Sequence, residues 1–121
     1  ATLTETMYSV AVHPNGQSVA AAGADRKVHL FDLLTGAEKL TMEGHTDYIH
    51  CVAFNSTGTR LLSYGYAGQL RVWNSADGKS LLEQRVGQIG NFADYAADGT
   101  RTLLSNGGGT ARVFEIPAAA Q

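Results

Sequence analysis

The sequence predicts an all-β fold in which one antiparallel unit is repeated three times along 121 residues. Short β-branched and aromatic runs alternate with turns rich in Gly, Asn and Asp, which is typical of a meander of strands. The turn residues and the aromatic residues recur together about every 42 residues, and such a period indicates a repeat architecture. Hydrophobic residues make up 44% of the chain and charged residues only 17%, so we expect neighbouring units to bury much of each sheet.

The clearest unit runs from residue 44 to residue 86. Its four apolar runs, which we expect to be antiparallel strands, are Tyr48–Phe54, Arg60–Gly65, Gln69–Trp73 and Ser80–Val86. The turns between them are Asn55–Gly58, Tyr66–Gly68 and Asn74–Gly78. Gly, Asn and Asp at such positions end a strand and permit the tight reversal into the next one. The unit is therefore expected to form a single four-stranded sheet.

Two further copies of this unit flank the central one. A turn glycine recurs at Gly16, Gly58 and Gly99, and an aromatic residue recurs at Phe31, Trp73 and Phe114. The three copies therefore span about residues 4–43, 44–86 and 87–116 of one repeat domain. In the first copy, the expected strands are residues 7–13, 18–23, 27–32 and 38–43.

The third copy is expected to have only three strands, at residues 91–97, 101–105 and 110–116. The turn glycine that precedes the fourth strand in the other copies has its equivalent at Ala119, close to the last residue, Gln121. Residues 117–121 are therefore expected to be a frayed tail. This sheet is expected to stay three-stranded or to take its fourth strand from another chain.

The repeat resembles that of the WD-repeat, or WD40-type, β-propeller family. Gly44-His45 matches the dipeptide that opens the family's repeat, and Trp73-Asn74 matches the Trp-Asp pair that closes it. Phe31-Asp32 and Phe114-Glu115 are weaker versions of the closing pair. The resemblance covers all three copies, and it implies that each sheet is one blade of a propeller.

The resemblance also implies a buried hydrogen-bond network within each blade. In the family, this network joins the His of the Gly-His pair, a Ser or Thr on the second strand, the Trp on the third strand and an Asp in the turn between those strands. The central copy supplies His45, Ser63 and Trp73 but has Ala67 in place of the Asp, whereas the first copy supplies only Asp25. Because no copy holds the complete network, we expect the blades to depend more on apolar packing.

Three blades are expected to form an open arc whose two end faces are apolar, and soluble proteins avoid leaving such faces in water. We therefore expect a ring to close by self-association through head-to-tail interfaces. A homotrimer with nine blades is favoured over a homodimer with six, because six blades require a sharper splay between sheets. Residues 2–5 resemble residues 40–43 and could complete the last blade of another chain, although an ungapped alignment places them in a loop.

The family's partners often dock on the face that carries the loops before the first strand and between the second and third strands of each blade. In this sequence, those positions hold Tyr48, His50, Tyr66, Arg26 and Gly107. An aromatic set with an arginine suits the centre of a protein interface, so the resemblance implies a partner-binding site here. The alternative is that these are ordinary loop residues.

Nothing in the sequence predicts catalysis, a metal site or a cofactor. The four histidines, His13, His29, His45 and His50, lack the Cys partners and acidic clusters of a metal site. The segment Asn106–Gly109 lacks the Gly-Lys-Ser/Thr ending of a phosphate loop and is expected to be a turn. Asp94 replaces an Ala of the other copies on an innermost strand and is expected to face the central channel or to pair with a neighbouring blade. Cys51 is expected to be a buried, inert thiol.

The composition excludes two classes of partner. A net charge of −2 gives no basic surface for nucleic acid, and no apolar run reaches the roughly 20 residues of a membrane-spanning helix. The sequence shows no signal peptide, so the compartment is left open, with the cytoplasm favoured.

The sequence therefore favours a non-catalytic, self-assembling scaffold that binds proteins. Two alternatives stay open. The first is a purely structural piece of a larger propeller, natural or engineered, with no ligand of its own. The second, less favoured, is an enzyme whose site lies in the central channel of the ring.

Overall fold

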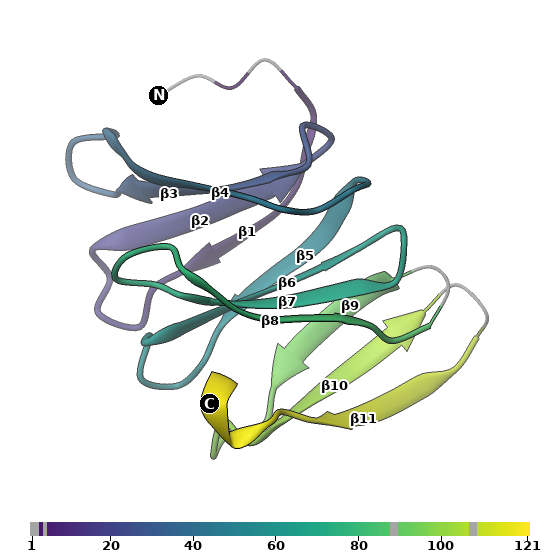
Figure 1. The fold of residues 1–121 in the computed structure, drawn as a ribbon. Helices are drawn as coiled ribbons and strands as arrows, with labels where there is room; N and C mark the ends of the chain where they lie inside the picture. The colour runs from purple at the N-terminus through teal and green to yellow at the C-terminus, as the bar shows by residue number, and fades with distance from the viewer. Residues whose placement is uncertain (1–2, 4, 88–89, 107–108) are drawn as a thin grey trace.

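The computed structural model describes residues 3, 5–87, 90–106 and 109–121. It contains three antiparallel sheets, which Figure 1 shows. Sheet one holds β1 (Met7–Val12), β2 (Ser18–Gly23), β3 (Lys27–Asp32) and β4 (Glu38–Glu43), and sheet two holds β5 (Ile49–Phe54), β6 (Arg60–Gly65), β7 (Gln69–Asn74) and β8 (Ser80–Arg85). Sheet three holds β9 (Gly90–Tyr95), β10 (Arg101–Asn106) and β11 (Ala111–Glu115). The predicted all-β class is confirmed, as are antiparallel sheets of four, four and three strands.

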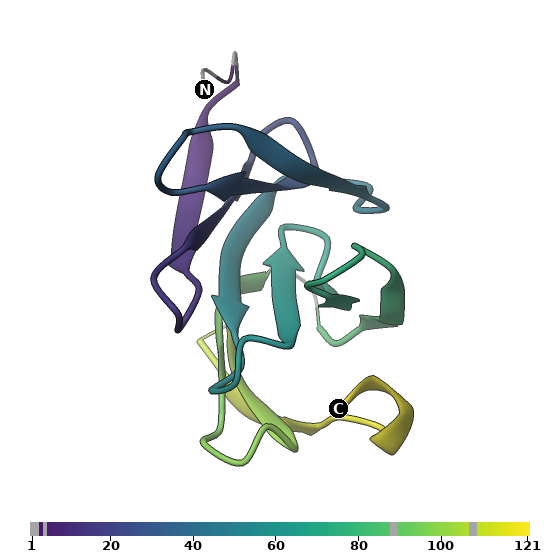
Figure 2. The same ribbon diagram turned by 90° about the vertical axis from the view of Figure 1, so that its left-hand side faces the viewer.

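The three sheets are stacked one after another along the chain, as the two views in Figures 1 and 2 show. Within each sheet, the strands follow one another in sequence order. Strand β5 of sheet two contacts β1 and β2 of sheet one, and β9 of sheet three contacts β5 and β6 of sheet two. The first strands of the sheets therefore lie side by side, an arrangement consistent with consecutive blades of a propeller.

Glycines in the left-handed backbone region make the turns at the positions that the repeat predicts. Gly16, Gly58 and Gly99 have φ angles of 73°, 77° and 75° between the first and second strands of their sheets. In the first of these turns, the amide of Gly16 donates to the carbonyl of His13 at 2.8 Å. Because L side chains rarely adopt this region, glycine permits the same tight reversal in each sheet.

Two apolar clusters hold the stack together. Between sheets one and two, the buried residues are Ala20, Ala22, Val28, Leu30, Met42, Ile49, Val52, Leu61 and Trp73. Between sheets two and three, they are Ala53, Leu62, Tyr64, Leu70, Val72, Val86, Ala93 and Leu104. Successive side chains of a strand point to opposite faces of its sheet, so the neighbours Leu61 and Leu62 belong to different clusters. Sheet two is therefore covered on both faces.

The outer faces of sheets one and three are apolar and exposed. We call Val10 and Val12 of β1 the leading face, and Phe92, Leu103 and Val113 of sheet three the trailing face. All five side chains are exposed to solvent in the single chain. Large apolar side chains gathered in this way are typical of surfaces that bind another protein surface.

The exposed residues of each end face have equivalents in sheet two that are buried inside the molecule. Leu103 is 55% exposed, whereas its equivalent in sheet two, Leu62, is 0% exposed against sheet three. Val10 is 66% exposed, whereas its equivalent, Val52, is 4% exposed against sheet one. The end faces therefore carry apolar residues at the repeat positions that bind a neighbouring sheet within the chain.

Sheet three has an open edge. Among the described residues, β11 pairs only with β10, whereas its equivalents β3 and β7 also pair with a fourth strand. The predicted contribution of residues 2–5 to such a sheet, and the predicted turn at residues 106–109, lie partly outside the described residues. An unpaired edge leaves backbone N–H and C=O groups available to a further strand.

The C-terminal tail forms a short turn that packs on sheet two. Residues Ala118–Ala120 form a single 3-10 turn, η1, which contacts β8. Ala120 is buried, and Gln121 Nε2 donates to the carbonyl of Ile116 at 2.7 Å. The buried side chain of Ile116 anchors the start of the tail, and alanines lose little side-chain entropy when they pack.

Candidate functional site

The predicted partner-binding residues that the structure describes lie in one continuous row. They are Arg26, Tyr48, His50 and Tyr66, and a further residue, Tyr8, joins them. The ring centroids of Tyr8 and Tyr48 are 6.1 Å apart, and those of Tyr8 and His50 are 5.3 Å apart. The rings of His50 and Tyr66 follow at 5.5 Å, and the guanidinium of Arg26 lies 5.9 Å from the centroid of the Tyr48 ring. We call these five residues the aromatic row. Gly107, which the sequence also placed here, lies outside the described residues.

Two β-bulges aim the central side chains of the row. In sheet one, Met7 pairs with Gly23 and Ser9 with Ala22, so Tyr8 is an extra residue in its strand. In sheet two, the register slips in the same way between Ile49 and Cys51, so His50 is extra. A bulge interrupts the alternation of side chains and re-aims the extra residue. The repeated irregularity therefore brings Tyr8 and His50 together from neighbouring sheets.

A backbone hydrogen bond places the other two tyrosines. The amide of Tyr66, in the β6–β7 turn, donates to the carbonyl of Tyr48 at 2.8 Å. Tyr48 precedes β5, and its own amide donates to Asp47 Oδ1 at 2.8 Å. Tyr8, Tyr48 and Tyr66 are 49%, 39% and 45% exposed. The row therefore has fixed backbones and rings that a partner could reach.

Arg26 has a backbone conformation that is unusual for a residue with a side chain. Its φ angle is 67°, and it is the one described residue other than glycine with a positive φ. The equivalent positions in the other sheets hold Gly68 and Gly109, with φ angles of 72° and 79°. The left-handed region costs a non-glycine residue roughly 1–2 kcal/mol. Arg26 therefore strains the backbone locally, whereas the glycines at the equivalent positions adopt the same conformation without strain.

Sequence reasoning missed Tyr8, which joins the row at its centre. Tyr8 is the equivalent of His50 one repeat earlier, and this alignment was the available signal. The bulge that turns both side chains to the same side depends on strand pairing, which single-sequence patterns do not reveal.

The central sheet contains three members of the hydrogen-bond network that the resemblance implies. Ser63 Oγ lies 2.6 Å from His45 Nε2 and accepts the indole N–H of Trp73 at 2.8 Å. The Ser63 hydroxyl is then free to donate its proton to His45 Nε2. Burial, and then the nearby charge of Arg71, lower the pKa of His45 to about 4. The buried imidazole is therefore neutral near pH 7.

Replacing His45 with alanine is expected to lower the free energy of unfolding at pH 7 by about 1–2 kcal/mol. The unfolded imidazole binds a proton below pH 6.5, but the folded one does so only near pH 4, so acid favours unfolding of the wild type. The stability that the wild type loses through this difference in proton binding reaches about 3 kcal/mol below pH 4. Urea unfolding from pH 7 to pH 4 should therefore show the wild type losing its advantage over H45A. A difference that stays constant with pH would contradict the buried, neutral His45.

The other residues on which the family resemblance rests, Gly44, Phe31 and Phe114, contribute to packing and not to a binding site. The carbonyl of Gly44 accepts from Arg71 Nη2 at 3.1 Å, and a Cβ at Gly44 would meet the same guanidinium at 2.5 Å. The ring of Phe31 stacks on that of His29 with centroids 6.0 Å apart. Phe114 packs against the cluster between sheets two and three.

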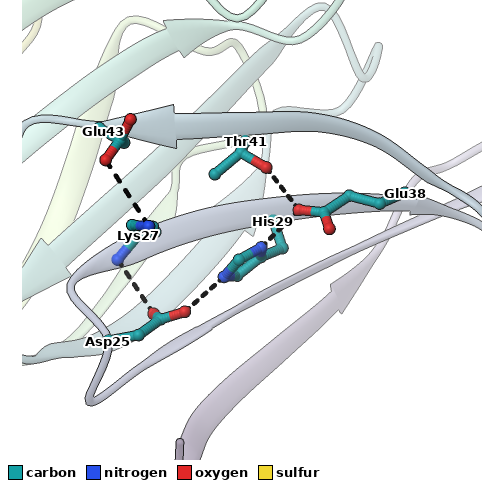
Figure 3. A network of polar contacts seen from close by, with 6 residues as sticks. All are labelled: Asp25, Lys27, His29, Glu38, Thr41 and Glu43. Carbon is teal, nitrogen blue, oxygen red and sulfur yellow. Dashed lines mark hydrogen bonds and ion pairs between the residues drawn. The ribbon is translucent and has the colours of Figure 1, made fainter. Parts of the chain in front are cut away.

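Asp25 belongs to a second network, in sheet one, that the sequence analysis missed. Figure 3 shows His29 between two carboxylates. His29 Nε2 lies 2.6 Å from Asp25 Oδ2, and Nδ1 lies 2.6 Å from Glu38 Oε1. Thr41 Oγ1 also donates to Glu38, and the amide of Lys27 donates to Asp25 Oδ1 at 3.1 Å. The network links the β2–β3 turn to strands β3 and β4.

The pKa of His29 is shifted in the opposite direction to that of His45. Burial opposes protonation of His29, but the hydrogen bonds to Glu38 and Asp25 outweigh it and raise its pKa. Both ring nitrogens can donate only when the imidazole is protonated. The two carboxylates therefore favour the protonated form of His29, and both of its ring nitrogens are already occupied.

Cys51 is a buried thiol, and Asp94 is an exposed carboxylate. The Cys51 thiol is buried, and its Sγ lies 3.2 Å from the carbonyl of Ala93. Burial raises the pKa of this thiol, which lowers its reactivity. Asp94 is exposed on β9, where its Oδ1 accepts the amide of Tyr95 at 2.8 Å.

Two searches of the described residues concern other kinds of site. In residues 3, 5–87, 90–106 and 109–121, no group of three or more His, Cys, Asp or Glu side chains is placed to hold a metal ion. The same residues contain no helix with the length and apolar character needed to cross a membrane.

Comparison with known proteins places these features in a family. The family model described as "WD domain, G-beta repeat" matches residues 1–32 and 36–74. THO complex subunit 6 homolog of Danio rerio is 38% identical over 64 residues, which cover 53% of this chain and 20% of that protein. The homolog of Mus musculus is 43% identical over 61 residues, which cover 50% of this chain and 18% of that protein.

A second group of relatives extends the similarity toward sheet three. Serine-threonine kinase receptor-associated protein of Bos taurus is 36% identical over 111 residues, which cover 83% of this chain and 32% of that protein. The chain thus spans about a fifth of the length of the THO complex relatives and about a third of the latter protein.

Proposed function

Because the chain belongs to the WD40 repeat family, we propose that it is a non-catalytic module that binds proteins and assembles into a propeller ring with further copies of itself. The relatives support the first half of this proposal. One is named as a subunit of a complex and another as a receptor-associated protein. A partner-binding role suits a stack of rigid sheets whose loops hold the exposed side chains.

The self-assembly is supported by the residues of the two end faces, which are equivalent to residues that sheet two packs against its neighbours. The trailing face (Phe92, Leu103 and Val113) occupies repeat positions that sheet two packs against sheet three. The leading face (Val10 and Val12) occupies positions that sheet two packs against sheet one. We therefore expect the trailing face of one copy to pack on the leading face of the next copy. This contact would repeat the way in which sheet two packs on sheet three within the chain. Such head-to-tail contacts form a ring when their rotation closes.

We favour three copies and nine blades over two copies and six. The angle between successive blades grows as their number falls, and six blades need a sharper splay than nine. A second copy could also supply a strand to the open edge of β11.

Within this assembly, we assign partner binding to Tyr48, His50, Tyr66 and Arg26, with Tyr8 added. Aromatic residues and arginine are the types that dominate binding energy at protein interfaces. The compartment is not assigned, because neither the fold nor the names of the relatives support the predicted cytoplasm.

The length of the relatives favours one alternative. Since this chain spans about a fifth of THO complex subunit 6, the neighbouring blades could belong to a longer polypeptide instead of to another copy. In that case, the chain alone is a structural segment of a larger propeller.

Native mass spectrometry of the wild-type chain distinguishes these arrangements. One chain has a mass of 12.8 kDa, and we expect a species of three times that mass, about 38 kDa. A species of twice the mass would contradict the trimer and support six blades. A folded species of 12.8 kDa at micromolar concentration would contradict self-assembly and support the longer polypeptide.

A further inference from the structure

We propose that sheet three detaches from sheet two as a unit while sheets one and two stay folded, and that another copy docked on the trailing face holds sheet three in place. The detachment goes beyond the proposed function, and only the second part of the proposal rests on that function.

Buried hydroxyl groups weaken the contact between sheets two and three. Tyr64 and Tyr95 belong to the apolar cluster between these sheets, and Thr102 faces it because it lies two residues before Leu104 on the same strand. Among the residues that the structure describes, the hydroxyl oxygens of Tyr64, Tyr95 and Thr102 are buried without a hydrogen-bond partner. Such a group gives up its hydrogen bonds to water and receives none in exchange, so each hydroxyl opposes the contact that buries it.

The repeat supplies an internal comparison for two of these residues. The equivalents of Tyr95 and Thr102 one repeat earlier are Phe54 and Leu61. Both of these side chains belong to the cluster between sheets one and two, where they fill the same places without a hydroxyl. The contact between sheets two and three therefore carries unpartnered polar groups where the preceding contact is apolar.

Sheet three also has fewer other features that hold it in place. In the described part of the chain, it has three strands where sheets one and two have four. Phe114 is only partly buried, whereas Trp73 at the equivalent position is 2% exposed. The exposed side chains of Ser56 and Arg112 donate to carbonyls across the contact, and water replaces such bonds readily. The chain should therefore open first between sheets two and three.

Docking of another copy would oppose this opening. The side chains of the trailing face, Phe92, Leu103 and Val113, all belong to sheet three, and their position relative to sheets one and two is fixed only while sheet three is attached. A copy that packs on this face in the proposed ring binds the attached form and not the detached one. Its binding therefore shifts the chain toward the attached form.

Two natural probes on opposite sides of sheet two test the detachment. Cys51 is the single cysteine, and its buried Sγ lies 3.2 Å from the carbonyl of Ala93 in sheet three. Trp73 is the single tryptophan and is buried between sheets one and two. The Val10→Glu chain is used, because its blocked leading face prevents docking of another copy on sheet three.

We expect a bulky fluorescent maleimide to label Cys51 at urea concentrations at which the fluorescence of Trp73 is still that of the native chain. Labelling then reports the loss of sheet three, while the tryptophan reports that sheets one and two stay packed. Labelling of Cys51 that begins only where the Trp73 signal changes would overturn the inference, because the three sheets would then unfold together.

Removal of the unpartnered hydroxyls should strengthen the contact. In the Val10→Glu chain, Thr102→Val and Tyr95→Phe keep most of the shape of the side chain, and each should slow the labelling of Cys51 by about tenfold. Thr46→Val is the control, because it removes the hydroxyl of an exposed threonine in the loop before β5, and it should leave the labelling rate unchanged. Labelling that Thr102→Val and Tyr95→Phe do not slow would also overturn the inference.

The effect of docking is measured on the wild-type chain, with its mass determined in the same samples. Assembled wild type should be labelled roughly tenfold more slowly than the Val10→Glu chain when the protein concentration is about ten times the dissociation constant. Equal rates in an assembled sample would contradict the stabilisation by docking. A chain that never assembles but shows early labelling of Cys51 would refute only the proposed self-assembly, and an assembled chain whose two probes respond together would refute only the detachment.

Discussion

Replacing Trp73 with alanine is expected to lower the free energy of unfolding by about 3–5 kcal/mol. Trp73 is 2% exposed and lies in the cluster between sheets one and two. Its loss leaves a cavity there and removes the indole N–H that Ser63 Oγ accepts at 2.8 Å. Urea unfolding followed by circular dichroism measures the change, because Trp73 is the single tryptophan and its fluorescence is lost with it.

Replacing Trp73 with phenylalanine is the matched control. Phenylalanine occupies the equivalent positions in the other copies, at Phe31 and Phe114, so a phenyl ring fits this place in the repeat. The loss should be about 1–2 kcal/mol, since the hydrogen bond goes but most of the apolar contact stays. Equal losses for W73A and W73F, or a loss below about 1 kcal/mol for W73A, would contradict the central role of Trp73 in the core.

Replacing Leu103 with glutamate is expected to convert the assembled protein into single chains. Leu103 is exposed in one chain and lies on the trailing face, where the proposed ring buries it. A carboxylate there would have to lose its water without a partner, at a cost of several kcal/mol per interface. Native mass spectrometry should show 12.8 kDa in place of about 38 kDa, and circular dichroism should show an unchanged fold.

Ala76→Glu provides the comparison for that result. Ala76 is exposed in the β7–β8 turn of sheet two, which contributes to neither end face. The A76E chain should therefore keep the wild-type mass. If A76E and L103E dissociate alike, the effect belongs to added charge and not to the trailing face.

The strands could be predicted from the sequence because their turns repeat. The bounds of β2, β3, β4 and β6 agree with the prediction, since glycine and polar residues mark both of their ends. Strand β5 begins at Ile49 rather than Tyr48. The backbone of Tyr48 is bound to Asp47 and Tyr66 instead of to a neighbouring strand, and a residue pattern alone does not distinguish the two.

The features that were missed depend on which residues face one another. The network of Asp25, His29 and Glu38 joins a turn to two strands, and the sequence showed only a histidine four residues after an aspartate. The turn at Ala118–Ala120 depends on a buried Ile116 and on contact with β8. Such pairings follow from strand register and tertiary packing, which periodicity does not specify.

The candidate site was partly predictable for the same reason. The repeat places Arg26, Tyr48 and Tyr66 in loops at the same end of their strands, so their proximity follows from the stacking of similar sheets. The position of Tyr8 beside His50 requires the two bulges. The left-handed backbone of Arg26 could have been suspected from the glycines at its equivalent positions.

The central claim is that the leading face of one copy binds the trailing face of another, and a mixing experiment tests it most directly. A Val10→Glu chain has a blocked leading face, and a Leu103→Glu chain has a blocked trailing face. Each alone should have a mass of 12.8 kDa. An equimolar mixture retains one intact interface and should form a species of two chains, one of each variant, in native mass spectrometry. A mixture that contains only single chains, while the wild type assembles, would contradict head-to-tail closure through these two faces.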